Sequence, residues 1–192
     1  MNSMLGASAI QQSLSKIYPF SEEQLTLFMD KLIYRKLKRK ELLISESQVS
    51  DGLSFILTGS FRSFKKLNDG ELTLKFFVEH NWITDLESLL TQQPSKNNIE
   101  AIEDSETVSI TLSDIHRLMD AHPCFRMLNA LMADLTISTS YLETISSKSP
   151  DERYRELLST HPQWINRFPQ MLIASYLGMT PETLSRVRAR VR

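Results

Sequence analysis

Near the C-terminus, several arginines and one carboxylate have the types and the spacing needed for hydrogen bonding to nucleic-acid bases. Glu182 and Arg186 lie four residues apart, so they share one face if the segment is helical. A guanidinium can fork onto O6 and N7 of guanine, and a carboxylate can accept a hydrogen bond from cytosine N4. Neighbouring arginines suit phosphates, which provide affinity without sequence preference. The residues expected to contact DNA are Thr180, Glu182, Thr183, Ser185, Arg186, Arg188 and Arg190.

The residues around this segment predict two helices joined by a tight turn. Ala174 is small enough for two helices to cross closely, and Gly178 suits a turn that needs a positive φ angle. Thr180 can cap a second helix that has Pro181 at its first position. Together these features predict a helix-turn-helix, whose second helix enters the major groove of DNA. The alternative is an amphipathic C-terminal helix whose arginines are only solvated, but spacing, turn glycine, cap and basic face agree on the first interpretation.

Charge is distributed unevenly along the chain, although the net charge is only −1. From Asp151 to Arg192 there are seven basic and four acidic residues, whereas the remainder carries 15 basic and 19 acidic ones. A basic C-terminal segment indicates an anionic partner, although a solvated charged face would look similar. Cys124 is the only cysteine, so no intrachain disulfide can form, which suits a reducing compartment. No run approaches the roughly 20 apolar residues of a membrane span, so we expect a cytoplasmic protein without a membrane partner.

The stretch from Ile33 to Ile110 consists of short apolar runs typical of strands. These runs cover residues 42–44, 53–57, 61–67, 72–78 and 107–112. The tripeptide Asn68-Asp69-Gly70 separates two of them and is a strong hairpin signal. Several short strands with close turns predict a sandwich or a barrel. With helices on either side, the expected fold class is α+β.

A helical pattern covers about residues 123–146 and carries leucines at alternating steps of three and four. We expect this seam to pair with a second chain, because a narrow apolar seam on a long helix is typical of coiled coils. A single helix packed on its own domain is the alternative. The seam residues are Leu128, Leu131, Leu135, Leu142 and Ile145. Ser149 and Glu152 then form a capping box after a hinge, which predicts a domain at 1–146 and another at 147–192.

In this order of elements the chain resembles the Crp/Fnr family of transcription regulators, over about residues 15–192. Residues 54–61 (Ser-Phe-Ile-Leu-Thr-Gly-Ser-Phe) look like the family's strand and turn around a near-constant glycine, here Gly59. Residues 82–85 (Trp-Ile-Thr-Asp) stand where the family has an aromatic residue, Ile, Gly and Glu. Residues 180–186 (Thr-Pro-Glu-Thr-Leu-Ser-Arg) resemble the start of its recognition helix.

The resemblance implies a fold and a set of partners. It implies an N-terminal double-stranded β-helix, a jelly-roll-like barrel, followed by a dimerisation helix and an all-α helix-turn-helix domain. The family's β-hairpin wing follows the recognition helix, and the sequence stops at Arg192, so we expect no complete wing. The implied partners are double-stranded DNA with an inverted repeat, a second copy of the chain, RNA polymerase and a small-molecule effector.

The sequence departs from the family where a cyclic nucleotide would bind. Thr84-Asp85 replaces the family's Gly-Glu pair, and no arginine stands between Arg62 and Arg117 to hold the cyclic phosphate. We therefore expect an effector other than cyclic AMP, or none. The candidate effector residues are Thr84, Asp85, Ser95, Lys96 and Asn97.

The sequence offers little for catalysis or for a cofactor. One cysteine cannot hold an iron–sulfur cluster, and the four histidines lack metal-ligand spacing. No Ser/His/Asp or Cys/His arrangement is evident either. We expect no cofactor, no metal and no enzymatic activity. The competing hypothesis is a ligand-sensing or protein-interaction module with a vestigial helix-turn-helix.

Overall fold

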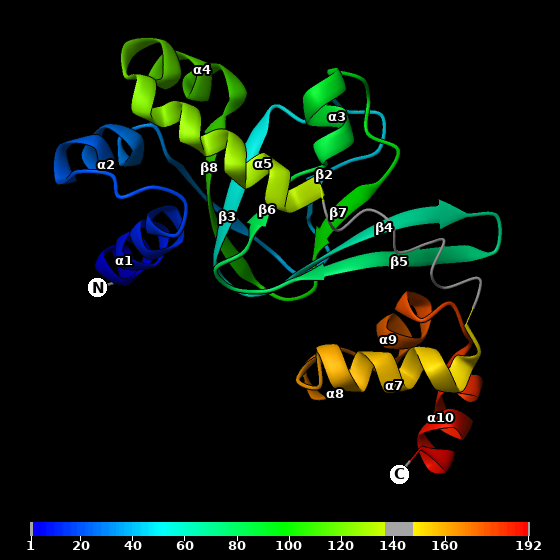
Figure 1. Ribbon diagram of the computed structural model, residues 1–192. Coiled ribbons are helices and arrows are strands. Elements are labelled where there is room, and N and C mark those ends of the chain that lie inside the picture. The colour runs from blue at the N-terminus through cyan, green and yellow to red at the C-terminus, as the bar shows by residue number, and fades with distance from the viewer. Residues whose placement is uncertain (1, 137–147, 192) are drawn as a thin grey trace. The chain divides into compact units, whose positions relative to one another are not determined.

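The structure is a computed structural model that describes residues 2–136 and 148–191. It divides into two compact units (Figure 1). The first, called the sheet unit, combines Met1–Arg62 with Phe76–Ile137. The second, called the helical unit, combines Ser63–Lys75 with Ser138–Arg192. The predicted mixture of helices and strands is confirmed.

The described strands form two four-stranded sheets. The first has the order β1-β8-β3-β6, with β1 at Ile33–Leu37, β8 at Ser105–Thr111, β3 at Gly52–Thr58 and β6 at Trp82–Ile83. The second has the order β2-β7-β4-β5, with β2 at Leu42–Ile44, β7 at Asn98–Ala101, β4 at Phe61–Leu67 and β5 at Gly70–Phe77. Both sheets are open, so the strands do not close into the predicted barrel. The edge strands β2 and β6 are only three and two residues long, which limits their pairing.

Successive side chains of β3 point into two different layers of the core. Phe55 pairs in register with Val108 of β8, and both face a helical layer that includes Phe28 and Phe125. Ile56 instead joins a second cluster with residues of the other sheet. The members of that second cluster are Leu37, Ile56, Phe61, Phe77, Ile83, Ile99 and Ala101. Each large apolar side chain buried in these clusters contributes about 1.5–3 kcal/mol to stability.

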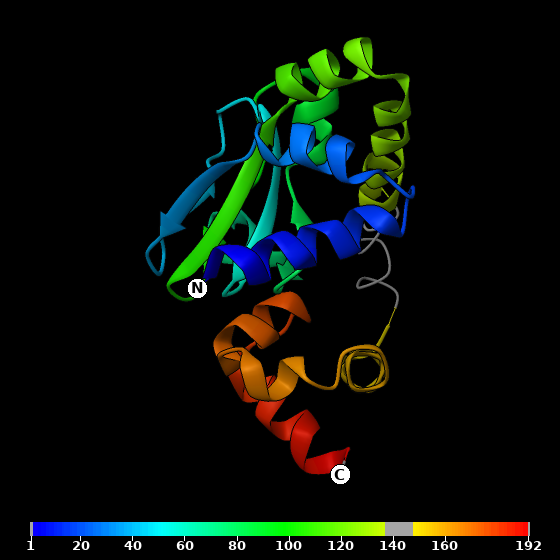
Figure 2. The same ribbon diagram turned by 90° about the vertical axis from the view of Figure 1, so that its left-hand side faces the viewer.

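Helices from both ends of the sheet unit cover one face of the first sheet (Figures 1 and 2). They are α1 (Asn2–Ser15), α2 (Glu22–Met29), α4 (Leu112–Ala121), the 3-10 helix η1 (Pro123–Leu128) and α5 (Asn129–Thr136), while α3 (Leu86–Thr91) follows β6.

A capping box begins α2: the backbone N–H of Gln24 donates to Ser21 Oγ, and Ser21 N–H donates to Gln24 Oε1.

The helix predicted over about 123–146 begins differently from the expectation. Residues 123–128 form a 3-10 helix, and α-helical geometry starts only at Asn129. The extended His122 separates α4 from η1, and Pro123 stands at the start of η1, where its missing N–H costs no helical hydrogen bond. The predicted seam residues Leu142 and Ile145 lie outside the described residues.

The helical unit contains α7 (Pro150–Thr160), α8 (Trp164–Arg167), α9 (Gln170–Tyr176) and α10 (Pro181–Arg190). The predicted capping box of Ser149 and Glu152 is present at the start of α7. The tip of the β4–β5 hairpin belongs to the same unit: the N–H of Thr73 donates to Ser175 Oγ at 2.8 Å, and that hydroxyl donates to the carbonyl of Glu71 at 2.8 Å.

Candidate functional site

A tight turn joins α9 to α10 and sets the direction of the second helix. Gly178 has a φ of 61°, the left-handed geometry predicted for it. Thr180 caps α10, since its Oγ1 accepts a hydrogen bond from the Thr183 N–H at 3.3 Å. Ala174 is fully buried, and Leu184 and Val187 are buried on the inner side of α10. The two helices therefore pack against each other, and one side of α10 remains free of the core.

Arg153 of α7 holds this turn in place. Its Nη1 donates to the carbonyl oxygens of Leu177 at 2.9 Å and Gly178 at 3.2 Å, and its Nε donates to the carbonyl of Lys148 at 2.9 Å. A guanidinium that satisfies several carbonyls at once fixes their positions relative to one another. Sequence reasoning counted Arg153 only as positive charge, because no local pattern links it to a turn 24 residues away.

The outer side of α10 exposes the predicted base-reading residues. Glu182, Ser185 and Arg186 are all exposed, and their spacing places them on one face. Within the described residues, Arg186 makes two long contacts of 3.4 Å, from Nε to the Glu182 carbonyl and from Nη2 to Thr183 Oγ1. Contacts of that length are weak, so the guanidinium can reorient toward a ligand. A hydrogen bond from the backbone of Glu182, followed by one from Thr180, lowers the pKa of the Glu182 carboxyl, which is therefore an acceptor at neutral pH.

The other two predicted arginines of α10 differ in their surroundings. Arg190 pairs with Asp151 of α7, with 2.6 Å between Nη2 and Oδ1. Its side chain stays 61% exposed, and an exposed pair is worth about 0–1 kcal/mol, so Arg190 can exchange Asp151 for a phosphate. Arg188 is half-buried beside the inner face.

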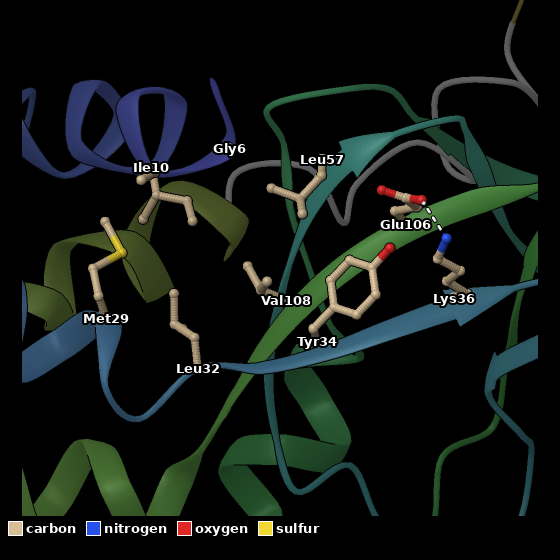
Figure 3. Close-up of a pocket in the computed structure, with 10 residues that line it drawn as sticks. Gly6, Ile10, Met29, Leu32, Tyr34, Lys36, Leu57, Glu106 and Val108 are labelled. Atoms are coloured by element: carbon tan, nitrogen blue, oxygen red, sulfur yellow. Dashed lines mark ion pairs between the residues drawn. The ribbon is translucent and has the colours of Figure 1, made fainter. Parts of the chain in front are cut away.

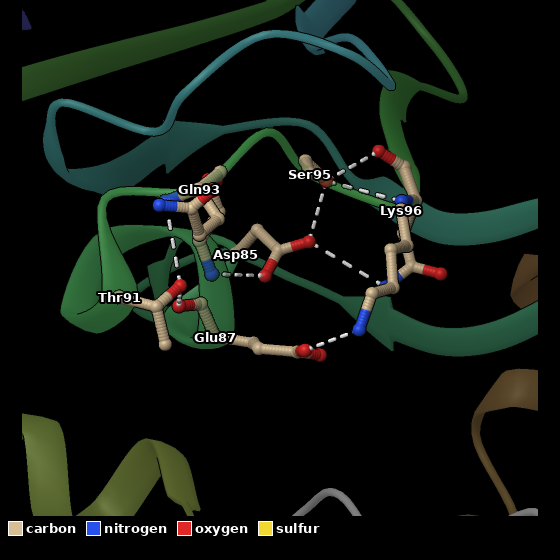
Figure 4. A network of polar contacts seen from close by, with 8 residues as sticks. Asp85, Glu87, Thr91, Gln93, Ser95 and Lys96 are labelled. Atoms are coloured by element: carbon tan, nitrogen blue, oxygen red, sulfur yellow. Dashed lines mark hydrogen bonds and ion pairs between the residues drawn. The ribbon is translucent and has the colours of Figure 1, made fainter.

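Three of the predicted effector residues, Asp85, Ser95 and Lys96, lie close together at α3 in a network of polar contacts (Figure 4). Asp85 caps α3: its Oδ1 accepts from the Ser88 N–H at 3.1 Å, and its Oδ2 accepts from Ser95 Oγ at 2.5 Å. Asn97 Nδ2 approaches the same Oδ2 at 3.4 Å. Thr84 is buried and donates to the Gly52 carbonyl at 2.9 Å. Both oxygens of Asp85 therefore already have partners within the protein.

A cavity of about 400 Å³ adjoins this network. Its charged residues are Asp85, Glu87 and Lys96, and Lys96 Nζ pairs with Glu87 Oε1 at 2.5 Å. The hydrogen bond to Glu87 raises the pKa of Lys96, so the ammonium stays charged but paired. Sequence reasoning missed Glu87 and Ser88, although an Asp immediately before an apolar helical residue, as Asp85 stands before Leu86, is an N-cap signal. Two carboxylates against one cation give the cavity a negative balance, which disfavours a phosphate.

The seam residues that the structure describes pack mostly against the core of their own chain. Leu128 and Leu131 are 1% and 7% exposed and belong to the core of the sheet unit. Leu135 is half-buried against the same core. Any pairing of two chains along this helix therefore depends on Leu135 and on residues further along the chain.

Two kinds of feature are absent from the part of the chain that the structure describes. No three His, Cys, Asp or Glu side chains within residues 2–136 and 148–191 are grouped so that they could hold a metal ion. None of the helices within those residues combines the length and the apolar character needed to cross a bilayer.

Comparisons with known proteins find one family model and several similar solved structures. Residues 34–122 match the family model described as "Cyclic nucleotide-binding domain". No curated protein matches the chain. The structure is similar to FixK2 from Bradyrhizobium japonicum, with a TM-score of 0.67 and 20% identity over 83% of this chain and 84% of that one. A putative Crp/Fnr transcriptional regulator from Eubacterium rectale has a TM-score of 0.66 and 23% identity, over 91% of this chain and 87% of its own.

A third similar structure is the c-di-GMP-responsive regulator CLP of Xanthomonas campestris. Its TM-score is 0.69 at 14% identity, over 89% of this chain and 91% of that one. The TM-scores show a shared fold, and identities this low support nothing beyond the fold.

Proposed function

We propose that this chain, which contains a cyclic nucleotide-binding domain and has the fold of the Crp/Fnr regulators, is a sequence-specific DNA-binding transcription regulator. In this proposal residues 1–146 form a sensor domain and residues 147–192 read DNA. The chain acts as a homodimer that binds an inverted repeat. The observation that supports it best is the exposed face of α10, which carries Glu182, Ser185 and Arg186 behind a turn fastened by Arg153.

The experiment is a titration of random and selected duplex DNA over a series of salt concentrations. A regulator binds random duplex with a steep salt slope, because each phosphate contact releases counterions. Selection from a random pool is expected to yield an inverted repeat with half-sites about 10 base pairs apart, one turn of B-DNA. If no DNA binds at low salt, the competing hypothesis of a protein-interaction module with a vestigial helix-turn-helix replaces this one.

Arg186→Ala is expected to cost about 1–3 kcal/mol at one base position of the selected site and to relax the preference there. Its affinity for random DNA should change little, because a base contact adds nothing on a non-specific site. Arg190→Ala should weaken binding to both DNAs alike and flatten the salt slope. Arg155→Ala is the matched control, since it removes the same charge from an exposed position on α7. Identical behaviour of Arg186→Ala and Arg190→Ala on the two DNAs would contradict the assignment of the reading face.

Cyclic AMP is not the effector in this proposal. A cyclic phosphate placed beside Asp85 and Glu87 meets two carboxylates, and the adjacent cation is already paired. We expect isothermal titration calorimetry with cyclic AMP to show no stoichiometric binding. Lys96→Ala should leave that result unchanged. Tight one-to-one binding that Lys96→Ala abolishes would show instead that Lys96 leaves Glu87 and serves the phosphate.

A further inference from the structure

A second cavity lies in the sheet unit, away from the α3 network. It is bounded by α1, the C-terminal end of α2 and strands β1, β3 and β8 (Figure 3). Its volume is about 490 Å³, within the range of roughly 300–1,000 Å³ that small-molecule sites occupy. No part of the DNA-reading surface or of the candidate effector pocket contributes to it.

Most of the wall of this cavity is apolar. Ile10 and Val108 are buried, and Met29, Leu32 and Leu57 pack partly buried around them. Figure 3 shows these five side chains arranged around the open space, with the backbone of Gly6 at the edge. An added Cβ at Gly6 would lie 3.1 Å from Leu57 Cδ2, so a larger residue there would extend toward the wall. The absence of a side chain at position 6 therefore helps to keep the space open.

The other end of the cavity is polar, and its charges balance. Lys36 Nζ lies 3.2 Å from Glu106 Oε1 and 6.0 Å from the centroid of the Tyr34 ring. A hydrogen bond to Glu106 raises the pKa of Lys36, so the ammonium remains charged. Desolvation, followed by a hydrogen bond to Glu106, raises the pKa of Tyr34, so its hydroxyl remains a neutral donor.

This polar end favours one class of head group. One cation beside one anion gives no net charge, so a neutral group can donate to Glu106 and accept from Lys36 or Tyr34. A carboxylate head would lie against the carboxylate of Glu106, and like charges repel at this range. An ammonium head would compete with Lys36 for the same carboxylate.

We propose that this cavity binds a small amphipathic molecule whose body is apolar and whose head group is uncharged and both donates and accepts hydrogen bonds. The body lies against Ile10, Leu57 and Val108, and the head reaches Tyr34 and Glu106. The site is independent of the proposed DNA binding, because its residues all belong to the sheet unit and its test uses no DNA.

The test uses N-phenyl-1-naphthylamine, a neutral apolar fluorophore with one N–H donor, titrated into the full chain. We expect saturable binding at one site per chain. Displacement should require about fivefold less 1-decanol than decanoate, because only the alcohol makes the extra hydrogen bond without repulsion. Gly6→Leu should weaken probe binding by about tenfold, because its side chain occupies the cavity. Ser8→Leu is the matched control: it introduces the same leucine at an exposed position of α1 that is not on the wall.

Glu106→Gln separates the role of the head group from that of the wall. Probe binding should persist in this variant, while the difference between decanol and decanoate should fall to about twofold or less, because the opposing charge is gone. Circular dichroism checks that each variant is folded. If Gly6→Leu fails to fold, the proposal is decided by the preference for decanol over decanoate, measured in the unmodified protein and in Glu106→Gln. The proposal is overturned by the absence of a saturable site, by equal affinities of folded Gly6→Leu and Ser8→Leu, or by equal displacement with both decyl compounds.

Discussion

Arg62→Met is expected to lower the free energy of unfolding by about 3–5 kcal/mol, because it leaves the Glu100 carboxylate without its partner in the interior. Arg62 Nε donates to Glu100 Oε1 at 2.7 Å, and the two side chains are only 7% and 16% exposed. The pair joins neighbouring strands β4 and β7 of the second sheet. Urea denaturation followed by tryptophan fluorescence measures the loss.

Two controls show whether burial causes this effect. The double variant Arg62→Met/Glu100→Leu should recover most of the stability, because it removes both charges from the interior. Lys38→Met breaks a pair of the same length, 2.7 Å to Asp104, whose side chains are 82% and 62% exposed. That variant should cost at most about 1 kcal/mol. If Arg62→Met and Lys38→Met lower the free energy of unfolding by similar amounts, burial is not the cause of the loss.

The pairing of Arg62 with Glu100 is also relevant to the proposal that cyclic AMP is not the effector. A guanidinium is the group best suited to a cyclic phosphate, and between Arg62 and Arg117 the sequence has no other arginine. The buried arginine is engaged in joining two strands. The sequence alone predicts that the family's phosphate-binding arginine is missing, and the structure adds that Arg62 is paired with Glu100.

Strands with strong apolar alternation and a clear turn were predictable. Strand β4 covers residues 61–67 as expected, and β5, which was expected over residues 72–78, extends from Gly70 to Phe77. Strands β1, β6 and β7 were not predicted, because their residues are mostly exposed, very few or partly polar. Such strands form through pairing with neighbours distant in the sequence, and local propensity does not contain that information.

The leucine seam shows a different limit of sequence reasoning. Its period correctly indicates an apolar face, but a period does not say which surface covers that face. Leu128 and Leu131 are buried in their own chain, next to Phe125 in the same core cluster. The dimer remains a prediction that depends on later positions of the helix.

In the candidate sites, too, local features were predictable from the sequence and contacts between distant residues were not. Capping and turn signals are local, so the roles of Thr180 and Gly178 were predictable from the sequence. The contacts of Arg153 with the turn and of Asp85 with Ser95 join residues separated along the chain, and they follow only from the fold.

Gly59→Ala is expected to lower the free energy of unfolding by at least about 3 kcal/mol, because backbone strain and overpacking each cost about 1–3 kcal/mol. Gly59 has a φ of 89°, and an added Cβ would lie 2.1 Å from Ser105 Oγ and 2.9 Å from Ser105 Cα. The backbone atom cannot rotate away, so β8 would have to move from the turn between β3 and β4. Thermal and urea denaturation measure the change.

Gly70→Ala separates the two causes of this loss. Gly70 also has a positive φ, 141°, but nothing lies within 4 Å of an added Cβ there. This variant should therefore show only the strain of about 1–3 kcal/mol. Adding Ser105→Ala to Gly59→Ala should restore only part of the loss, because it removes the hydroxyl and leaves Ser105 Cα in place. Equal losses for the two glycine variants, or full restoration by Ser105→Ala, would show that the close approach of the backbone at Gly59 does not require a glycine.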